Sequence, residues 1–345
     1  MILCLAPSPA VDRLLRLDGP LRPGAIHRPV EVVATAGGKG LNVARVAAAL
    51  GAEVRALAPL GGTIGRWIME QLEADGVAVD RVPIRAEPRT CVSVAGAGQA
   101  LTELYEPAAP LEPDEWAAFE RAVGEFAAGA RWVTLSGSQP AGAPPDAFAR
   151  LIRLAHRAGA HVALDSHGAS LRSGLSAQPE LVKVNRVEAS EVAADVFALR
   201  ELAGGNGHAA AVTNGLAGIR LVDDEGRLLE ASPPLEGDYP VGSGDALLAA
   251  LTLARARGAP GSRSSALPAP RPVTEQPGSV IGRQRLRRRG RRRAVVASSI
   301  DAADPDERRE FTRSLRAQQS GTRLLRRRCA GGDPECQRVL PRVAA

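Results

Sequence analysis

The sequence has few aromatic residues and few cysteines. Phe, Trp and Tyr make up 3% of the 345 residues, although hydrophobic residues reach 45%. A core of useful size is therefore possible, but it must be built from Ala, Leu and Val. Cys4, Cys91, Cys329 and Cys336 lie far apart and show no C-x-x-C spacing. This spacing gives no support for a zinc site or a disulfide framework, and we interpret the thiols as buried or incidental.

Long apolar runs are also missing. A membrane-spanning helix needs roughly 18–20 consecutive apolar residues, and no run in the sequence approaches this length. The N-terminal apolar run, Ile2 to Ala6, has neither the basic flank nor the small-residue cleavage site of a signal peptide. We therefore expect a cytoplasmic protein with no membrane partner.

The formal charge of +6 is unevenly distributed. Residues 259–345 contain 20 Arg, no Lys and 8 acidic residues, which is a net charge of +12. Residues 1–258 contain the other 24 basic and 30 acidic residues, which is a net charge of −6. The basic character thus belongs to the C-terminal segment alone.

The segment 259–345 differs from the rest in composition as well as charge. It begins with a stretch rich in Pro, Ser and Gly, and RQRLRRRGRRR follows. Neither helical nor strand periodicity persists there, so we expect disorder. The arginines could bind nucleic acid through its phosphates, with an affinity that falls steeply with salt. No aromatic stacking platform or recognition motif accompanies them, so we expect no nucleic-acid partner.

Residues 1–258 alternate between apolar strand patterns and helical patterns. Strands are predicted at 2–6, 54–60, 131–135, 161–165, 181–184 and 209–213. Helices are predicted at about 41–50, 64–75, 113–128, 145–158 and 187–203. This alternation predicts an α/β fold with a mostly parallel sheet and helices on both faces. Ligands of such sheets bind at the carboxyl ends of the strands.

Four further β-like segments follow one another without long helices between them. They lie at about 11–17, 30–35, 90–95 and 101–105. We expect these segments to form a small second sheet that serves as a lid or as a dimer surface.

A glycine-rich acidic turn stands in the segment YPVGSGDALLAALTLARA, residues 239–256. Gly242, Ser243 and Gly244 form a turn of small residues, and Asp245 begins an apolar helix. Backbone N–H groups at such a turn converge and bind anions such as phosphates. A carboxylate there can accept a proton from an alcohol while the turn holds phosphoryl oxygens. The alternative is an ordinary helix N-cap, for which Ser and Asp are preferred.

Only two lysines occur beside 42 arginines. A chain so rich in Arg keeps Lys where a compact point charge is needed, or keeps it by chance on the surface. Lys39 lies in AGGKGLNVARVAAALG, where a Gly-rich turn runs into a helix. Lys183 lies at the end of a predicted strand, where a ligand site of an α/β fold is expected.

Asn185 and Glu188 follow Lys183 with N-x-x-E spacing. Their oxygens suit Mg²⁺, which usually binds through water. The same spacing is also that of a helix capping box. The sequence leaves both interpretations open.

Five segments together resemble, in order, the PfkB branch of the ribokinase-like family over about residues 1–258. They are PSPAVD at 7–12, AGGKGLNVARVAAALG at 36–51, LSGSQPAG at 135–142, VKVNRVE at 182–188 and VGSGDA at 241–246. TELYEPA at 102–108 resembles a segment of the 1-phosphofructokinase and tagatose-6-phosphate kinase subgroup. The resemblance implies a ribokinase-like three-layer α/β/α fold with a small β-sheet lid. It also implies the use of ATP and Mg²⁺.

The subgroup phosphorylates ketohexose monophosphates, so the resemblance implies an ATP-dependent kinase that converts fructose 1-phosphate to fructose 1,6-bisphosphate. A tagatose 6-phosphate or fructose 6-phosphate kinase is the neighbouring alternative. A catalytically inactive remnant that still dimerises through its lid strands, and a protein that binds nucleic acid through its basic tail, are alternatives of another class.

The resemblance also implies a role for each matching residue. The residues expected to bind the sugar are Asp12, Gly38, Lys39 and Asn42. Those expected at the substrate's existing phosphate are Arg89 and Ser138, and Arg28 is expected to reach a neighbouring subunit's site in a homodimer formed through the lid strands. Those expected at the transferred phosphoryl group are Gly242, Ser243 and Gly244, with Asp245 as the base. Those expected at the nucleotide are Lys183, Asn185, Thr213, Gly215 and Gly218, with Mg²⁺ held by Asn185 and Glu188 through water.

The C-terminal part departs from the family pattern. Members of the family continue past the acidic turn with helices that cover the adenine, whereas this chain continues with the Arg-rich and Pro-rich segment. We hypothesise a change of reading frame near residues 258–262. Translation of the neighbouring frames of the coding DNA tests this hypothesis, which fails if neither frame encodes an apolar sequence with helical periodicity.

Overall fold

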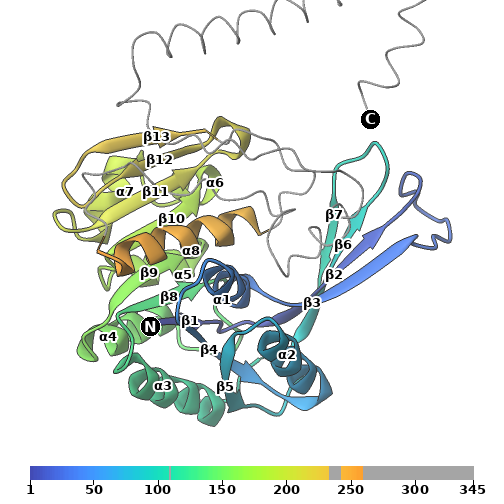
Figure 1. Ribbon diagram of the computed structural model, residues 1–345, viewed down its shortest axis with the longest axis horizontal. Helices are drawn as coiled ribbons and strands as arrows, with labels where there is room; N and C mark the ends of the chain where they lie inside the picture. Colours follow the sequence, from blue (N-terminus) through green and yellow to red (C-terminus); the bar gives the residue numbers. More distant parts are fainter. Residues whose placement is uncertain (109, 233–241, 259–345) are drawn as a thin grey trace, which may run out of the picture. The chain divides into compact units, whose positions relative to one another are not determined.

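Within the described part of the chain, the larger of two β-sheets has nine strands, and β1 (Ile2–Leu5) is the third strand from one edge (Figure 1). The computed structural model describes residues 1–108, 110–232 and 242–258 of the chain. The predictions for residues 259–345 therefore lie outside the described residues, as does Val241 at the start of the acidic-turn motif. The strand order is β13 (Leu228–Ala231), β12 (Ile219–Val222), β11 (Ala209–Thr213), β10 (Leu181–Asn185), β9 (His161–Asp165), β8 (Trp132–Ser136), β1, β4 (Val54–Leu60) and β5 (Ala78–Pro83).

The strands from β11 to β5 all pair in parallel, and β12 and β13 add an antiparallel edge. The chain runs outward from β1 through β4 and β5, and then returns to β8 on the other side of β1. The direction of winding therefore reverses between β1 and β8. In an open α/β sheet, ligands bind beyond the carboxyl ends of the strands at such a reversal.

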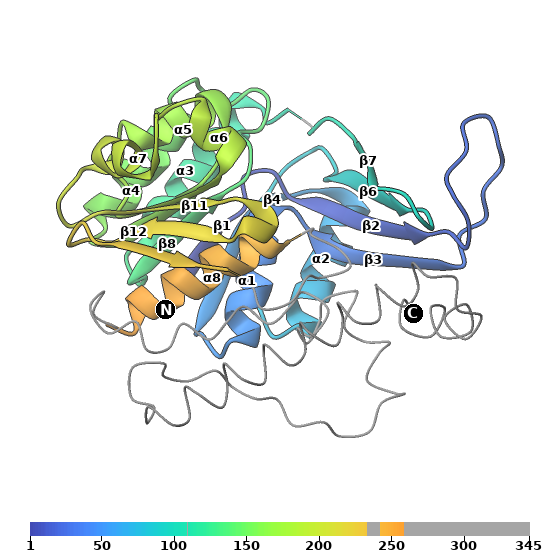
Figure 2. The same ribbon diagram turned by 90° about the horizontal axis from the view of Figure 1, so that it is seen from above.

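Helices cover both faces of this sheet (Figure 2). On one face lie α1 (Lys39–Ala49), α2 (Gly62–Ala74) and α8 (Ser243–Ala256). On the other lie α3 (Pro113–Ala127), α4 (Ala147–Arg157), α5 (Gly168–Leu175), α6 (Arg186–Ser190) and α7 (Val196–Ala203). The predicted α/β fold with three layers is thus confirmed.

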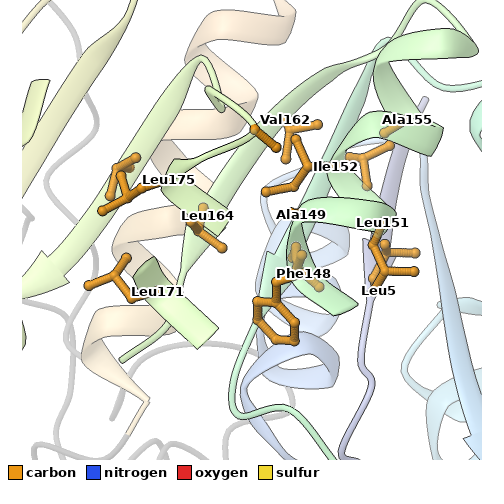
Figure 3. Packing of buried hydrophobic residues seen from close by; sticks show 14 of the residues in the cluster. Leu5, Phe148, Ala149, Leu151, Ile152, Ala155, Val162, Leu164, Leu171 and Leu175 are labelled. Atoms are coloured by element: carbon orange, nitrogen blue, oxygen red, sulfur yellow. The ribbon is translucent and has the colours of Figure 1, made fainter. Parts of the chain in front are cut away.

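Burial on both faces explains the apolar character of the central strands. In β1, Leu3 and Leu5 pack in one hydrophobic cluster, whereas Ile2 and Cys4 pack in the other. Figure 3 shows the first cluster, where side chains of α4 and α5 meet those of β1 and β9. Aliphatic side chains predominate there, as the scarcity of aromatic residues predicts. Burial raises the pKa of the Cys4 thiol to about 12, so this cysteine is a packing residue.

The smaller sheet has four strands in the order β3 (Glu31–Gly37), β2 (Ala10–Arg16), β6 (Arg89–Ala95) and β7 (Thr102–Tyr105). β2 pairs antiparallel with β3 and parallel with β6, and β7 adds an antiparallel edge. The second sheet expected from the sequence is therefore present. β2 follows directly after β1, so the smaller sheet begins where β1 of the larger sheet ends.

One predicted helix is wrong. The segment 187–203 forms two helices, α6 and α7, with residues 191–195 between them. The side chain of Asp195 accepts a hydrogen bond from the backbone N–H of Ala198 at 2.8 Å and so caps the start of α7. The helical spacing of apolar residues continues through residues 191–195, so the sequence pattern does not reveal that the helix is interrupted there.

The structure also adds elements that the sequence patterns did not predict, namely β5, α5, β12, β13 and the short 3₁₀ helix η1 (Gly215–Ala217). Across the described ranges, no helix combines the length and the apolar character that crossing a membrane requires.

Candidate active site

The acidic turn forms the N-terminus of α8. Gly242 precedes the helix with φ of 82°, a left-handed conformation that glycine adopts without strain. Since the N-cap residue is a glycine, no side chain caps the helix from this position. The ordinary N-cap interpretation, with Ser or Asp as the capping residue, therefore does not describe this turn. Its amides are the kind of groups that bind anions.

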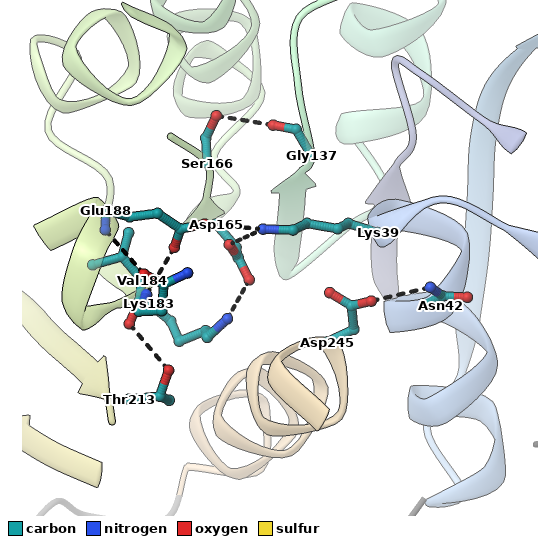
Figure 4. Close-up of polar contacts among 11 residues, drawn as sticks. Lys39, Asn42, Gly137, Asp165, Ser166, Lys183, Val184, Glu188, Thr213 and Asp245 are labelled. Atoms are coloured by element: carbon teal, nitrogen blue, oxygen red, sulfur yellow. Dashed lines mark hydrogen bonds and ion pairs between the residues drawn. The ribbon is translucent and has the colours of Figure 1, made fainter. Parts of the chain in front are cut away.

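Asp245 lies in the first turn of α8 and is 5% exposed. Its Oδ2 accepts a hydrogen bond from Nδ2 of Asn42, on α1, at 3.1 Å (Figure 4). Burial, together with the negative charge of Asp165, raises the pKa of Asp245 to about 6, against the opposing effects of Lys183, Lys39 and Asn42. A carboxylate with a pKa near neutrality is suited to act as a general base.

The two lysines of the chain meet at one carboxylate. Nζ of Lys39, at the start of α1, lies 3.1 Å from Oδ1 of Asp165. Nζ of Lys183, on β10, lies 2.5 Å from Oδ2 of the same residue (Figure 4). Segments separated by 144 residues thus converge on the end of β9. The Lys183 side chain is buried and the Lys39 side chain is 35% exposed, but both are held in ion pairs with Asp165.

Asp165 is a site residue that sequence reasoning missed. It is fully buried at the last position of β9. Its position at the end of the strand predicted at 161–165 was a signal that could have found it, because ligands of such sheets bind at the strand ends. Burial opposes the charge, but Lys183 and Lys39 together hold the pKa of Asp165 below its usual range.

On the side of the smaller sheet, Asp12 of β2 accepts a hydrogen bond at Oδ2 from the backbone N–H of Gly38 at 3.3 Å. Gly37 leaves room for this carboxylate, because a Cβ there would lie 2.2 Å from Cγ of Asp12. Burial raises the pKa of Asp12, while Gly38, Asn42 and the charge of Arg89 oppose the increase. Asn42 therefore interacts with the carboxylates of both Asp12 and Asp245.

Arg89 begins β6 and lines a pocket with Ser8, Pro9, Glu87 and Pro140. Its Nη1 donates to the backbone oxygen of Glu106 at 3.3 Å. Among the described residues, Nε of Arg89 and Oγ of Ser8 are buried without a hydrogen-bond partner. Buried polar atoms of this kind are usually satisfied, so this pocket fits a ligand that accepts hydrogen bonds. Sequence reasoning selected Arg89 but missed Ser8.

Two of the predicted site residues, Ser138 and Arg28, lie farther from the groups described above. Ser138 lies on the loop after β8, two residues before Pro140 of the pocket, and is half-buried. Arg28 is exposed in the loop between β2 and β3, beyond the pair Arg16–Glu31 and at the opposite end of the strand from Asp12. The structure does not bring Arg28 into this cluster, and its contact with a neighbouring subunit stays a prediction.

The residues expected at the nucleotide lie at the ends of β10 and β11. Asn185 and Thr213 are opposite each other in the sheet. The loop after β11 turns at Gly218, with φ of 89°, where a Cβ would lie 2.0 Å from the backbone oxygen of Ala231. Gly215, also at positive φ, has open space around its Cα. This loop therefore needs glycine at 218 for its close backbone contact.

Asn185 and Glu188 form a capping box at the start of α6. Oδ1 of Asn185 accepts from the N–H of Glu188 at 2.9 Å, and Oε2 of Glu188 accepts from the N–H of Asn185 at 2.7 Å. Oε1 of Glu188 lies 3.6 Å from Nζ of Lys39. The described residues contain no group of three or more His, Cys, Asp or Glu side chains able to hold a metal ion. Carboxylate and amide oxygens nevertheless fit Mg²⁺ that keeps several of its waters.

Comparisons with known proteins agree with this geometry. The profile described as pfkB family carbohydrate kinase matches residues 9–269. The 1-phosphofructokinase of Haloferax volcanii is 33% identical over 280 residues, which cover 75% of this chain and 85% of that protein.

Solved structures give the same result. Phosphofructokinase-2 from Escherichia coli in complex with substrates and products is 29% identical, with a TM-score of 0.69, over 75% of this chain and 87% of that one. The tetrameric inhibited form of the same enzyme is 29% identical, with a TM-score of 0.68, over 75% of this chain and 88% of that one.

Proposed function

This chain belongs to the pfkB family of carbohydrate kinases, and from that premise we propose that it transfers the γ-phosphoryl group of ATP to fructose 1-phosphate, giving fructose 1,6-bisphosphate. It is a phosphotransferase with an alcohol group as acceptor and acts on a sugar phosphate. The identity of the ketohexose monophosphate is the part that we propose.

One observation carries the proposal. The buried carboxylate of Asp245, with a pKa of about 6, adjoins a glycine turn and shares its cluster with two lysine ammonium groups. An alcohol is a poor nucleophile, and phosphoryl transfer depends on positioning and on stabilisation of charge. This cluster supplies a base and the positive charge in one place.

In the proposed reaction, the free hydroxyl oxygen of the sugar forms a bond to the γ-phosphorus, and the bond from that phosphorus to the β,γ-bridging oxygen breaks. The hydroxyl proton passes to Asp245, and ADP leaves with the electron pair of the broken bond. The amides of Gly242 to Gly244 and the two lysines stabilise the negative charge on the phosphoryl oxygens.

The substrate's existing phosphate is proposed to occupy the pocket beside Arg89. The unpartnered Nε of Arg89 and Oγ of Ser8 are donors that a phosphate can satisfy, and Ser138 lies on an adjoining loop. Arg forms paired hydrogen bonds with a phosphate dianion. Asp12 and Asn42 would then bind hydroxyl groups of the sugar between this pocket and Asp245.

ATP is proposed to lie over the carboxyl ends of β10 and β11, near Lys183, Thr213 and the loop containing Gly215 and Gly218. When bound, Mg²⁺ neutralises charge on the nucleotide phosphates. Asn185 and Oε1 of Glu188, the oxygen that also faces Lys39, would hold it through water. Lys39, whose pKa is raised by Asp165, Glu188 and Asp245 despite its burial, stays protonated beside this site.

A coupled assay that detects ADP tests the substrate. With ATP and Mg²⁺ present, we expect fructose 1-phosphate to give the highest kcat/KM among fructose 1-phosphate, fructose 6-phosphate and tagatose 6-phosphate. A higher value for either 6-phosphate would replace the proposed substrate with the neighbouring one. No turnover of any of the three would overturn the proposed function.

The chain is also proposed to form a homodimer through the smaller sheet. Val32 and Leu104 are 50% and 60% exposed, and the strand pairing puts them on the same face of this sheet. Exposed apolar side chains in a small sheet favour burial against another copy. Light scattering tests this, since Leu104→Lys should shift the protein to the monomer. A wild-type monomer would refute the proposal.

A further inference from the structure

We propose that Asp165 is a positioning residue that holds the ammonium groups of Lys39 and Lys183 at separate points along the path of the transferred phosphoryl group. Each oxygen of its carboxylate takes one lysine, at 3.1 Å for Lys39 and 2.5 Å for Lys183. The inference rests on the proposed phosphoryl transfer. It assigns to Asp165 a role that acts through the lysines, with no contact to the substrate.

Asp165 and Lys183 are buried, so each charge needs an oppositely charged partner. Asp165 is fully buried and Lys183 is 3% exposed, so neither charge is stabilised by bulk water. A buried charge without its partner is strongly disfavoured. A lysine side chain is also flexible, with a point charge at the end of a four-carbon chain. The carboxylate therefore fixes positions that the lysines alone would not keep.

The ammonium groups of Lys39 and Lys183 lie in different parts of the site. Nζ of Lys183 lies against the acidic turn, since a Cβ at Gly244 would be only 2.7 Å from it. Lys39 begins α1, the helix that also carries Asn42, and its second carboxylate partner is Glu188. One ammonium group thus lies at the turn, and the other lies between the sugar-binding helix and the capping box of α6. Moving the carboxylate of Asp165 displaces both.

Asp165 also affects the base. Its negative charge raises the pKa of Asp245, whereas the charges of Lys39 and Lys183 and the hydrogen bond from Asn42 lower it. These groups come from β9, α1 and β10, the elements around the first turn of α8. Removing the negative charge and removing a lysine should therefore shift the titration of Asp245 in opposite directions.

The test is a double-mutant cycle on the full chain, with Asp165→Asn, Lys39→Met and the double variant. Each single variant should lose on the order of 10²-fold in kcat, as expected for misplaced charges. The double variant should lose little more than Asp165→Asn alone, because both changes remove the same interaction. The acid limb of the pH–rate profile, which reports the pKa of Asp245, should move to lower pH in Asp165→Asn. In Lys39→Met it should move to higher pH.

Two results would overturn the proposal. One is a multiplicative loss in the double variant, on the order of 10⁴-fold, which means independent roles. The other is an Asp165→Asn variant whose acid limb is unchanged but which needs a higher Mg²⁺ concentration for activity. This result would mean that the carboxylate of Asp165 acts on the metal ion. If the wild-type protein phosphorylates no sugar phosphate, the proposed function fails and the inference fails with it.

Loss of folding in Asp165→Asn is detected by circular dichroism and thermal unfolding. In that event Asp165→Glu replaces it in the cycle, because it keeps the charge and moves it by one methylene. The expected result is then a lower kcat with the acid limb near its wild-type position. A kcat equal to that of the wild type would show that the placement of this carboxylate is unimportant.

Discussion

Replacing Asp245 with Asn removes the negative charge and keeps an oxygen that can accept the hydrogen bond from Asn42. Because the fold raises the pKa of Asp245 from 3.8 to about 6, the native state favours the protonated form. A shift of about 2 pKa units corresponds to about 3 kcal/mol. The folded wild-type protein thus carries this cost once the pH rises above about 6. Asn, which resembles the protonated form, avoids the cost.

Two opposite effects follow for Asp245→Asn. Loss of the base should lower kcat by roughly 10²–10⁴-fold. The variant should nevertheless be more stable than the wild type by up to about 3 kcal/mol at pH 8. The gap should shrink as the pH falls and vanish below about pH 4, where the carboxyl is protonated in both the folded and the unfolded state.

The assay compares thermal unfolding of the two proteins at pH 8 and pH 4, together with kcat and the pH–rate profile. At pH 8 we expect the variant to melt several degrees higher, at about 2 °C per kcal/mol. Asp80→Asn is the control, since Asp80 pairs with Arg55 on β4 and β5 away from the site and should leave kcat unchanged. A variant less stable than the wild type at pH 8, or one with full activity, would refute the reasoning.

Three further predictions concern other parts of the chain. Arg89→Lys should raise KM for the sugar phosphate roughly tenfold with a smaller change in kcat, because Lys cannot form the paired contact of Arg; steady-state kinetics measure both. Gly244→Ala should lower both kcat and the melting temperature, because the new Cβ would lie 2.7 Å from Nζ of Lys183 and would displace this buried ammonium from Asp165. Glu180→Gln should lower the melting temperature at pH 7 and have no effect well below pH 4, because burial raises the pKa of Glu180 but bonds from His156 and Val162 hold it lower overall.

A different result would contradict each of these three predictions. Unchanged KM in Arg89→Lys would remove Arg89 from the phosphate pocket. An unchanged melting temperature in Gly244→Ala would mean that Lys183 can move away from the turn without losing its contact with Asp165. A stability difference for Glu180→Gln that persists at low pH would assign the effect to packing, because both side chains are then uncharged.

The sequence alone indicated the fold because its patterns are local. Buried strands such as β1 and β9 are short apolar runs, and amphipathic helices lie between them, so the parallel sheet follows from chain order. The break between α6 and α7 escaped detection because the apolar spacing continues through it. Asp195, which caps α7, is an ordinary polar residue until the hydrogen bond is seen.

The candidate site was partly visible for the same reason. The turn before Asp245 can be recognised in the sequence from its glycines. Lys39 and Lys183 can be recognised because they are the only two lysines in the sequence. The sequence could not show that the two lysines share one carboxylate, because that depends on which strands are neighbours in the sheet.

What the sequence determined by itself is therefore the set of local elements, the glycine-rich turn before Asp245 and the two rare lysines, since these are visible without knowledge of the fold. Tertiary structure alone decided that Asp165 lies between the two lysines and that Ser8 joins Arg89 in one pocket. It also decided that burial raises the pKa of Asp245. Those properties arise from groups far apart along the chain, and they exist only where the carboxyl ends of the strands meet.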